Sequence, residues 1–584
     1  MARYYVGLAN TLHDSALAVV GPDGRVLFAE ANERFLQNKR SINAPPDLFS
    51  HARAVIDEHC EPDAELVVAQ SWSGRAVPIM QRMLEQLRGE ERQLVDVFGE
   101  VPDFMRTHFA SREYLYAAQI SAINQTGLTL KYELNQSERR PYVRSLPVRA
   151  YDHHLTHAAA AAYTSPFDEA VCGVLDALGE GTSTACFSYR DGRIQRIDDN
   201  ADSVAGSLGF FYTFVCVVCG FGHLTGEEWK VMGLAAYGKP RAELYELFRS
   251  MIEVDGVDIR FARDQSLLPI FKRLHDIRRR SDESPFAAAD LAYAGQQVFT
   301  EVYFEFLRNL RELGGSDNLV LGGGCALNSS ANGRILANTG YERVHVFSAP
   351  GDDGNAVGAA LLAHREDHPD HPASEGVQSP YLGSSVSQDT LDKLRTYGPR
   401  KQARLDRDEL CRRVARHLAD GRLVGWAQGR AEFGPRALGN RSILADARDP
   451  GMKDKINGRV KFREEFRPFA PSILHEYGDE YFEDYQESPY MERTLRVRED
   501  KAAEIPAVVH EDGTSRLQSV RWETNETYYR LLDEFRRITG VPLLLNTSFN
   551  VMKKPIVHSV EDMVAVFHTS GLDVLVIGDT VFEK

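Results

Sequence analysis

The chain has 584 residues, of which 43% are hydrophobic and 26% charged, so it is long enough to form two or more domains with separate cores. Its formal net charge of −16 disfavours general binding to nucleic acid or to an anionic membrane. The seven cysteines are scattered and do not resemble a disulfide framework. We therefore expect a cytoplasmic protein in a reducing compartment, with no membrane or nucleic-acid partner.

The first predicted element is a β-hairpin in residues Tyr4–Glu30, with an Asp-Gly turn at Pro22–Arg25 between apolar runs. A second segment, Ala170–Ile197, repeats the order of strand, polar loop, strand and Asp-Gly turn, and its turn lies at Arg190–Arg193. The polar loops NTLHDS and LGEGTS then fall at equivalent places and offer hydroxyls and backbone N–H groups to phosphate oxygens. This duplication favours the actin/Hsp70/sugar-kinase (ASKHA) ATPase fold, with two unrelated hairpins as the alternative.

Two helical segments are predicted between and around these hairpins. The stretch PIMQRMLEQLRGEERQL has helical spacing of its apolar side chains, which we assign to the core: Met80, Met83, Leu84 and Leu87. The alanine run in HHLTHAAAAAYTSPF predicts a helix that begins near His153. His153 and His157 are four residues apart and share one helical face, which is a compact half of a metal site. Helix capping or packing by these histidines is an equally open interpretation.

The apolar stretch Ser207–Leu224 barely reaches the length of a membrane span, and we expect a buried helix or strand pair instead. Its Cys216 and Cys219 form a single C-x-x-C without a second pair, so we interpret them as buried structural thiols. A further helical block is expected over roughly residues 243–313.

Two later segments add small and acidic residues to the expected cleft. The segment Asn318–Ile335 is predicted as a strand, a triple glycine and a helix start, and the chain contains no P-loop pattern. The segment Ser348–Ala363 places Asp352 and Asp353 in a loop before a helix of small residues. A carboxylate there is either a helix N-cap or a further metal ligand.

Residues 364–380 are rich in Pro, His and acidic side chains and are interpreted as a linker between a domain of residues 1–370 and one of residues 371–584. Beyond it, residues 427–474 concentrate basic side chains separated by Gly and Pro: Arg430, Arg436, Arg441, Arg448, Lys461, Arg463 and Arg467. Guanidinium groups suit phosphate and carboxylate oxygens, so the group as a whole predicts a small-anion site. Separate salt bridges are the alternative for any one of them.

Together these motifs resemble the nodulation-type and antibiotic-tailoring O-carbamoyltransferases. HHLTH, DALGEGTST, GEEWKVMGLAAYG, GGGCALN and GDDGNAVGAA resemble their N-terminal domain, and RAEFGPRALGNRSILADARDP, VKFREEFRPFAPS, DGTSRLQ and NTSFN their C-terminal domain. The resemblance implies an α/β protein with an N-terminal duplicated ASKHA-type domain and a C-terminal YrdC-like domain. It also implies ATP as cofactor, carbamoyl phosphate as donor and a carbamoyl-AMP intermediate made in the second domain and consumed in the first.

The resemblance assigns roles to individual residues. The metal ligands would be His153, His157, Asp176 and Asp352, holding one divalent ion, Fe(II) first, with Mn(II), Zn(II) or Mg(II) as alternatives. The carbamoyl phosphate residues would be Arg436, Lys461, Arg467, Arg516 and Ser548, with Arg436 and Lys461 also catalytic. His13 would be the general base, with loop hydrogen bonding as the alternative. The nucleotide contacts would be Gly179, Gly181, Thr182, Gly322, Gly323, Gly324, Asn328 and Lys230. Lys39 and the pair Glu228 and Lys230 are weaker candidates near the acceptor.

The acceptor implied is a hydroxyl of a small natural product such as an amino-sugar, macrolide or polyketide. Asn32 replaces a commoner acidic residue near the presumed acceptor entrance, and a homodimer is left open. Three other functions are considered. A tRNA-threonylcarbamoylating enzyme is disfavoured by the acidic charge, and an actin-like ATPase that binds a partner would not need an arginine pocket. A sugar kinase is the third, and it would release ADP.

Overall fold

The computed structural model describes residues 2–199, 206–222, 225–262, 267–371, 376–398 and 401–584. The chain forms two compact units. Unit 1 comprises Met1–Asn32, Arg40–Leu327 and Ile335–Gln378, and unit 2 comprises Glu33–Lys39, Asn328–Arg334 and Ser379–Lys584. Unit 2 therefore includes two short segments that precede residue 371. A division into residues 1–370 and 371–584 would assign both segments to the first domain.

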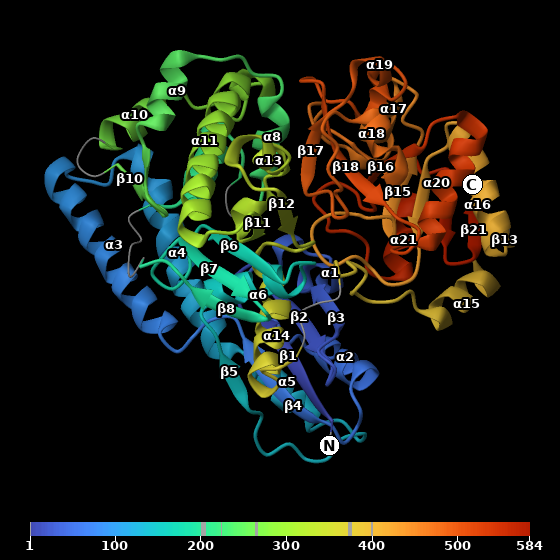
Figure 1. Cartoon of the computed structure of the whole chain (residues 1–584), viewed down its shortest axis with the longest axis horizontal. Helices are drawn as coiled ribbons and strands as arrows, with labels where there is room; N and C mark the ends of the chain where they lie inside the picture. The colour runs from blue at the N-terminus through green and yellow to red at the C-terminus, as the bar shows by residue number, and fades with distance from the viewer. Residues whose placement is uncertain (1, 200–205, 223–224, 263–266, 372–375, 399–400) are drawn as a thin grey trace. The chain divides into compact units, whose positions relative to one another are not determined.

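Unit 1 contains two five-stranded sheets of the same topology (Figure 1). The first has the order β3-β2-β1-β4-β5 and the second the order β8-β7-β6-β11-β12. In each, three strands form an antiparallel meander, and two further strands run parallel to its first strand. The strands are β1 (Arg3–Ala9), β2 (Ala16–Val20), β3 (Val26–Ala31), β4 (Glu65–Gln70), β5 (Val148–Ala150), β6 (Glu169–Leu175), β7 (Thr184–Arg190), β8 (Arg193–Arg196), β11 (Asn318–Gly322) and β12 (Arg343–Val346). The predicted duplication and its ASKHA-type arrangement are confirmed.

The Asp-Gly turn of the second repeat has the geometry that its sequence requires. Arg190 pairs with Arg193, so the loop between β7 and β8 has two residues, Asp191 and Gly192. Both have positive φ, 50° and 75°, as a type I′ turn demands. Gly24 in the first repeat also has a positive φ of 76°.

Two helices of small residues pack between the sheets. Helix α6 (His153–Tyr163) follows β5 of the first sheet but packs on β6 and β11 of the second, whereas α14 (Asn355–Asp367) follows β12 and packs on β1 and β2 (Figure 1). The two helices also pack on each other, and a Cβ at Gly358 would lie 1.9 Å from the carbonyl oxygen of Thr156. Only a glycine there allows the backbones to approach so closely.

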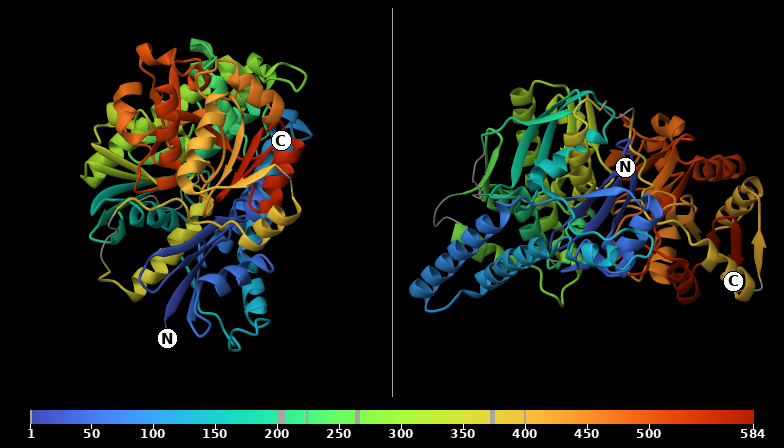
Figure 2. Two further views of the ribbon diagram at one scale, coloured as in Figure 1. Left: turned by 90° about the vertical axis from the view of Figure 1, so that its right-hand side faces the viewer. Right: turned by 90° about the horizontal axis from the view of Figure 1, so that it is seen from below.

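Helical insertions flank these layers. Between β4 and β5 lies the long pair α3 (Ala76–Phe98) and α4 (Asp103–Gln125), which pack on each other and are the projecting blue helices in Figure 2. Met80, Met83 and Leu87 of α3 are buried as predicted. The remaining helices of unit 1 are α2 (His51–His59), α5 (Leu128–Leu134), α7 (Leu208–Val218), α8 (Trp229–Ala235), α9 (Ala242–Arg249), α10 (Leu267–Ile277), α11 (Ala289–Gly314) and α13 (Ile335–Thr339).

Two expectations for these segments need correction. The block over residues 243–313 is not all helical, because a hairpin of β9 (Ile252–Asp255) and β10 (Asp258–Phe261), joined by Gly256 and Val257, interrupts it. The predicted linker begins too early, because α14 extends to Asp367 and His364 is buried in it. Residues 372–375 of that linker lie outside the described residues.

The apolar segment that begins at Ser207 forms α7, an 11-residue helix, and all seven cysteines are free and buried. Within the described ranges, no helix combines the length and the apolar character needed to cross a bilayer.

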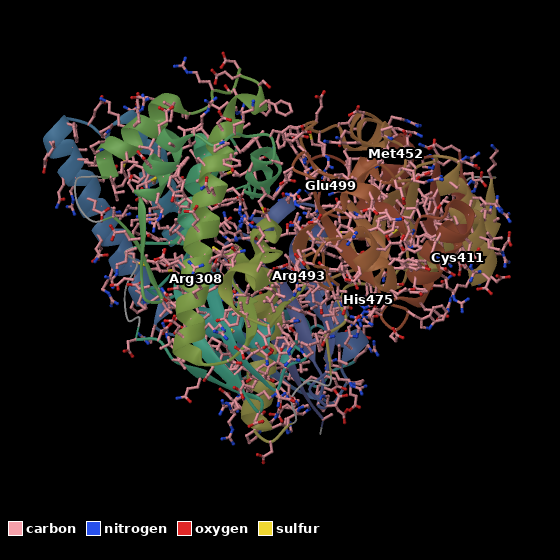
Figure 3. All side chains as sticks on the ribbon, turned by 45° about the horizontal axis from the view of Figure 1, so that its top comes forward. Arg308, Cys411, Met452, His475, Arg493 and Glu499 are labelled. Carbon is pink, nitrogen blue, oxygen red and sulfur yellow. The ribbon has the colours of Figure 1, made fainter. Side chains whose placement is uncertain are left out.

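Unit 2 is built on one mixed nine-stranded sheet with the order β13-β21-β20-β14-β15-β19-β16-β18-β17. Its strands are β13 (Gln402–Arg404), β14 (Val424–Ala427), β15 (Arg441–Ala445), β16 (Ala470–Leu474), β17 (Arg493–Arg496), β18 (Thr514–Val520), β19 (Leu543–Ser548), β20 (Val574–Ile577) and β21 (Thr580–Glu583). Its helices are α1 (Asn32–Leu36), α12 (Ser329–Asn332), α15 (Gln388–Tyr397), α16 (Arg407–Ala419), α17 (Met452–Ile456), α18 (Gly478–Tyr481), α19 (Glu499–Ala502), α20 (Glu526–Thr539) and α21 (Val560–Thr569). Cys411 and Met452, labelled in Figure 3, are part of its large hydrophobic core. The C-terminal α/β domain is confirmed.

Candidate active site

Four potential metal ligands meet inside unit 1, and each comes from the end of a different secondary-structure element or helical turn. His153 and His157 lie on the first turns of α6, where the Asp152 carboxylate caps the helix by accepting a hydrogen bond from the N–H of Leu155 (3.1 Å). Asp176 directly follows β6, and Asp352 opens the 3-10 turn that leads into α14. Residues from both halves of the duplication thus converge on one point.

The ligand atoms of this group have the spacing that a metal ion requires. The Nε2 atoms of His153 and His157 are 3.2 Å apart. Carboxylate oxygens of Asp176 and Asp352 lie 3.3 to 3.5 Å from these nitrogens. Ligands at about 2.1 Å from a tetrahedral ion stand about 3.4 Å from one another, which is close to these N–N and N–O distances. All four potential ligand atoms lie within 4.8 Å of one another, so the group suits a divalent metal.

The charges of the four groups are strongly interdependent. Burial on its own lowers the pKa of His153, but its interactions with Asp176 and Asp352 outweigh burial and raise that pKa to about 10. Burial would raise the pKa of Asp176, yet the two histidines hold it well below its usual range. Two buried carboxylates paired with two imidazoles match the charge of a dication, which would replace the protons.

The triple glycine turns back onto this group. The N–H of Gly324 lies 3.2 Å from Oδ1 of Asp176, and the N–H of Gly323 lies 3.3 Å from Nδ1 of His157. Gly323 has a φ of +85°, and a Cβ there would lie 2.2 Å from the carbonyl oxygen of Leu175. The structure thus brings Gly322, Gly323 and Gly324 beside the metal ligands, whereas Asn328 belongs to unit 2 and caps α12 by accepting from the N–H of Ala331 (3.1 Å).

The loop at Gly179–Thr182 is held by the second histidine of HHLTH, His154. Nδ1 of His154 lies 3.2 Å from Oγ1 of Thr182, and a Cβ at Gly179 would come within 2.5 Å of the imidazole. Gly181 has a positive φ of 93°. Burial, followed by the charge of His153, lowers the pKa of His154 to about 3, so this ring is neutral. His154 therefore supports the loop and is not aimed at the metal ligands.

His13 lies at the edge of the metal group. Its Nδ1 is 3.0 Å from Asp14, 3.0 Å from Nη2 of Arg40 and 3.6 Å from Oδ2 of Asp352. Arg40 also binds Asp14 at 2.8 Å. These contacts fix the imidazole next to a metal ligand.

Two further candidate residues make contacts within unit 1. Lys230 is buried in an ion pair with Glu227 (2.7 Å) and lies over the rings of Phe221 and Trp229. Asn32 is fully buried, and its Nδ2 donates to Ser15 and to the carbonyl oxygens of Pro45 and Pro46, so it supports the backbone and does not line an entrance.

Trp72 is a component of this site that sequence reasoning did not find. Its indole stacks on the His153 imidazole with ring centroids 4.1 Å apart and an interplanar angle of 27°. Its neighbour Ser73 donates from its backbone N–H (2.5 Å) and its hydroxyl to the Glu180 carboxylate. Residues after β4 thus brace both the helix with the histidines and the loop at Gly179–Thr182.

Unit 2 contains a group of basic side chains, which we call the anion cluster: Arg436, Lys461, Arg463, Arg467, Arg516 and the adjoining Ser548. Nζ of Lys461 donates to Ser548 Oγ (3.1 Å) and Asn550 Oδ1 (2.6 Å), as well as to their carbonyl oxygens. Lys461 is the last residue of a π-helix (Asn457–Lys461), an irregular element that is frequent at functional sites.

The cations of this cluster repel one another. Burial lowers the pKa of Arg436 to about 10, and burial together with the charges of Arg436 and Arg463 lowers the pKa of Arg516 well below its usual value. Burial and the charges of Arg463 and Arg467 lower the pKa of Lys461 in the same way. Arg463 was not among the residues assigned to carbamoyl phosphate. An anion placed here would relieve both repulsion and desolvation.

The other arginines of the same sequence region are structural. Arg441 is fully buried and donates to the carbonyl oxygens of Gln428, Gly429, Asn440 and Ser384. Arg430 donates to the carbonyl oxygens of Leu382 and Gly383, and Arg448 pairs with Asp446 at 2.7 Å. The suggestion that the whole basic segment converges on one pocket is therefore wrong for these three residues.

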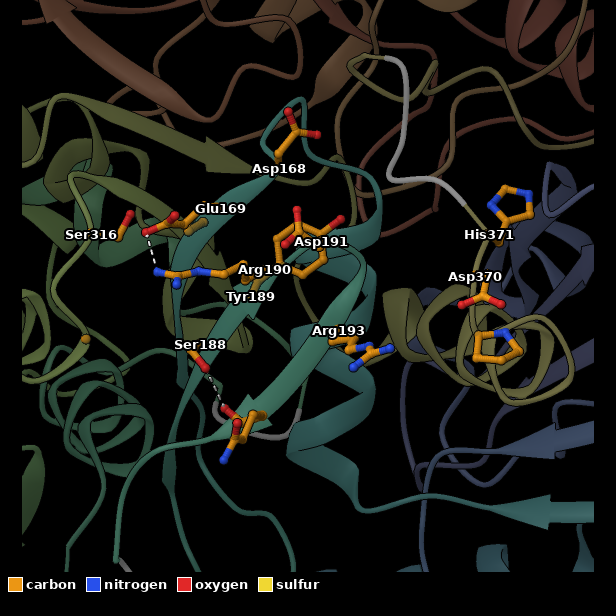
Figure 4. Close-up of a pocket in the computed structure, with 14 residues that line it drawn as sticks. Asp168, Glu169, Ser188, Tyr189, Arg190, Asp191, Arg193, Ser316, Asp370 and His371 are labelled. Carbon is orange, nitrogen blue, oxygen red and sulfur yellow. Dashed lines mark hydrogen bonds and ion pairs between the residues drawn. The ribbon is translucent and has the colours of Figure 1, made fainter.

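A separate, open pocket lies at the opposite end of β6 from Asp176 (Figure 4). It has a volume of about 900 Å³ and polar walls with charges of both signs, including the Arg190–Glu169 ion pair (3.0 Å). Asp168 and Glu169, at the start of β6, line this pocket, whereas Asp176 follows the end of the same strand. The pocket is therefore separate from the metal ligands.

Comparison with known proteins identifies the family of the chain. Residues 4–361 match the family profile described as the carbamoyltransferase N-terminus, and residues 415–584 match the carbamoyltransferase C-terminus. Nodulation protein NolNO of Sinorhizobium fredii is 38% identical over 74% of the chain, a match that spans 63% of that relative, which is less than two thirds of its length. An uncharacterized protein of Synechocystis (sll1178) is 33% identical over 100% of the chain and 97% of its own length.

Solved structures show weaker similarity. Full-length HypF in its phosphate- and nucleotide-bound form is 12% identical, with a TM-score of 0.33 over 62% of this chain and 55% of HypF. A ROK family glucokinase from Streptomyces griseus is 13% identical, with a TM-score of 0.24 over 62% of this chain and 98% of the glucokinase. The two family profiles, each matched in its own part of the chain, establish that the protein belongs to the carbamoyltransferase family and is a carbamoyltransferase enzyme.

Proposed function

We propose that the protein is an ATP-dependent O-carbamoyltransferase that uses carbamoyl phosphate and modifies a hydroxyl of a small-molecule natural product. The observation that carries this proposal is the pair of complementary sites: a cation-rich cluster in unit 2 and a histidine–aspartate group in unit 1. The first suits a donor with a phosphate, and the second suits a metal ion beside a nucleotide phosphate.

In unit 2, Arg436, Lys461, Arg467, Arg516 and Ser548 would bind carbamoyl phosphate. Water cleaves this donor to carbamate and inorganic phosphate, and the cations stabilise the phosphate as it leaves. A carbamate oxygen then attacks the α-phosphorus of ATP, and pyrophosphate departs, which leaves carbamoyl-AMP. Free carbamate decomposes readily, so the buried position of Lys461 supports its formation in a protected pocket.

In unit 1, His153, His157, Asp176 and Asp352 would hold one divalent ion, with Fe(II) as the first candidate and Mn(II), Zn(II) or Mg(II) as alternatives. When bound, such an ion supplies Lewis acidity and a fixed anchor for phosphate and carbonyl oxygens. The backbone N–H groups near Gly322–Gly324 and the loop at Gly179–Thr182 would position the nucleotide.

His13 would accept the proton of the acceptor hydroxyl. The hydroxyl oxygen attacks the carbonyl carbon of carbamoyl-AMP, the bond to AMP breaks, and the products are a carbamate ester and AMP. The 3.6 Å between His13 Nδ1 and Asp352 Oδ2 supports this role, because a base at that position would be beside the group that would hold the reacting adenylate.

The acceptor class is an amino-sugar, a macrolide or a polyketide with a free hydroxyl. The test is to incubate the purified protein with ATP, carbamoyl phosphate, Fe(II) and a panel of such compounds. Mass spectrometry should find one added carbamoyl group on an acceptor, together with equimolar AMP and pyrophosphate. Formation of ADP, or nucleotide hydrolysis that does not depend on carbamoyl phosphate, would contradict the proposal and would favour a kinase or an actin-like ATPase.

A further inference from the structure

The segment Glu33–Lys39 lies far from the C-terminal part of the sequence but belongs to unit 2. Arg34 is almost fully buried, and its Nη2 donates to the carbonyl oxygen of Gly434 at 2.6 Å. Gly434 has a φ of +111° and is two residues before Arg436. Arg34 therefore holds the backbone of the loop that presents a main cation of the anion cluster.

The same loop is braced at its other end by a single carboxylate oxygen. Oε1 of Glu432 accepts hydrogen bonds from the N–H groups of Leu438 (2.7 Å), Asn440 (2.8 Å) and Arg441 (3.0 Å). None of these bonds reaches Gly434, which leaves its carbonyl to Arg34. Two residues thus hold the loop that carries Arg436: Glu432, within the loop itself, and Arg34, from residues 33–39.

Gln37 holds a second loop of the anion cluster. Its Nε2 donates to the carbonyl oxygen of Ile556 (3.0 Å), and Nζ of Lys554 donates to the carbonyl oxygen of Gln37 (3.1 Å). The carbonyl oxygen of Lys554 in turn accepts from Nδ2 of Asn550 (2.7 Å), whose Oδ1 binds Nζ of Lys461. Gln37 is therefore connected by hydrogen bonds to the turn that surrounds Lys461.

Two further features indicate that this segment serves a site and does not only fill space. Nη1 of Arg34 is buried without a hydrogen-bond partner among the described residues, which is costly in a purely structural role. The charge of Lys39 contributes to the lowered pKa of Lys461, which places the end of the segment within electrostatic range of the cluster.

We propose that residues 33–39 are an integral part of the anion site of unit 2, in which Arg34 is a positioning residue for Arg436 and Gln37 for the turn that holds Lys461. The inference rests on the proposed function only in taking that anion to be carbamoyl phosphate. It predicts that loss of Arg34 weakens phosphate binding although Arg34 need not touch the phosphate.

The test uses the full chain, with inorganic phosphate as the probe and the shift in melting temperature as the readout. Arg34→Ala should raise the phosphate concentration for half-maximal stabilisation about tenfold, and Gln37→Ala about threefold, as expected for the loss of single buried hydrogen bonds. Arg34→Lys, which can still donate to Gly434, should recover much of the affinity. The control is Arg25→Ala, an exposed arginine in the turn of the same N-terminal hairpin.

Arg436→Ala is the reference that separates this inference from the proposed function. If Arg436→Ala abolishes the phosphate effect while Arg34→Ala, Arg34→Lys and Gln37→Ala bind phosphate like the unmodified protein, the inference is wrong and the anion site stands. If Arg436→Ala also binds phosphate normally, the anion site itself is refuted.

In assays of pyrophosphate release, Arg34→Lys and Gln37→Ala should raise KM for carbamoyl phosphate and leave KM for ATP unchanged. A uniform loss of kcat would indicate a merely structural role and would overturn the inference.

Discussion

The Nε2 atoms of His153 and His157 face each other at 3.2 Å, one helical turn apart in α6. A bound metal ion requires both imidazoles in their neutral form, in which each Nε2 offers a lone pair. Asp176 and Asp352 add two carboxylates at 3.3 to 3.5 Å. A shared cation satisfies all four acceptors at once, so this relationship leads directly to tests of metal binding.

Asp352→Asn should lower the affinity for the divalent metal by at least about a hundredfold, because it removes one of two anionic ligands. Asp353→Asn is a matched control, since Oδ1 of Asp353 accepts a hydrogen bond from the N–H of Gly354 (3.1 Å) and is not one of the four ligands. Metal content after dialysis, measured by mass spectrometry, checks the result. Equal metal content in the two variants would refute the site.

Trp72 should report on metal binding through its fluorescence, because its indole stacks on the His153 imidazole at 4.1 Å. Titration with Co(II) should quench the tryptophan emission of the unmodified protein, and Trp72→Phe should remove most of the change. Trp522→Phe, which replaces a partly exposed tryptophan in unit 2, should leave the Co(II)-induced quenching unchanged. Quenching that survives in Trp72→Phe would show that the ion binds elsewhere.

His13→Asn should block carbamoyl transfer without blocking formation of the adenylate. Transfer should fall by about a hundredfold or more, as for loss of a general base, whereas pyrophosphate release driven by carbamoyl phosphate should continue. Separate assays of pyrophosphate and of the carbamoylated acceptor check this split. A parallel loss of both activities would assign His13 to an earlier step.

Lys461 should make phosphate binding depend on pH. In the empty folded site its pKa lies below the usual 10.5, so between the two values the unfolded chain binds more protons, and the stability of the empty protein rises with pH in that window. Bound phosphate favours the ammonium form, so binding takes up a proton and weakens as pH rises through the lowered pKa. Calorimetry in two buffers of different ionisation enthalpy measures the uptake, and Lys461→Arg should reduce it. Identical heats in both buffers for the unmodified protein would contradict this account.

Two glycines of unit 1 should respond in opposite directions to the same substitution. A Cβ at Gly7 in β1 would lie 1.8 Å from the carbonyl oxygen of Ala356 in α14, so Gly7→Ala should destabilise the protein by about 3 kcal/mol or more. Gly89 lies inside α3 with no atom within 4 Å of its added Cβ, so Gly89→Ala should stabilise it by about 1 kcal/mol. Thermal unfolding of both variants measures the difference, and a stable Gly7→Ala protein would contradict the close packing of β1 on α14.

Sequence patterns predicted the parts of the molecule that depend on local spacing. The Asp-Gly turns located both hairpins, and the i, i+4 spacing of His153 and His157 indicated a shared helical face. The carboxylates were placed through family resemblance, because nothing local brings Asp176 and Asp352 together across the fold.

Other features depend on tertiary contacts that spacing does not encode. Arg436 and Arg441 are five residues apart in similar sequence. Arg436 makes no hydrogen bond or ion pair among the described residues, whereas Arg441 donates to four carbonyl groups. Trp72 reaches His153 only because β4 ends beside α6. The assignment of Arg34 to unit 2 likewise requires the folded chain.

The exchange of α6 and α14 between the two sheets of unit 1 has a consequence for how this enzyme can be divided. Each repeat covers its sheet with the helix that the other repeat supplies, so a chain cut between them would leave two fragments with bare alanine-rich faces. We expect that neither fragment would fold alone. Two coexpressed fragments would reach the native fold only by associating with each other. The same association would bring together the metal ligands at the N-terminal ends of α6 and α14.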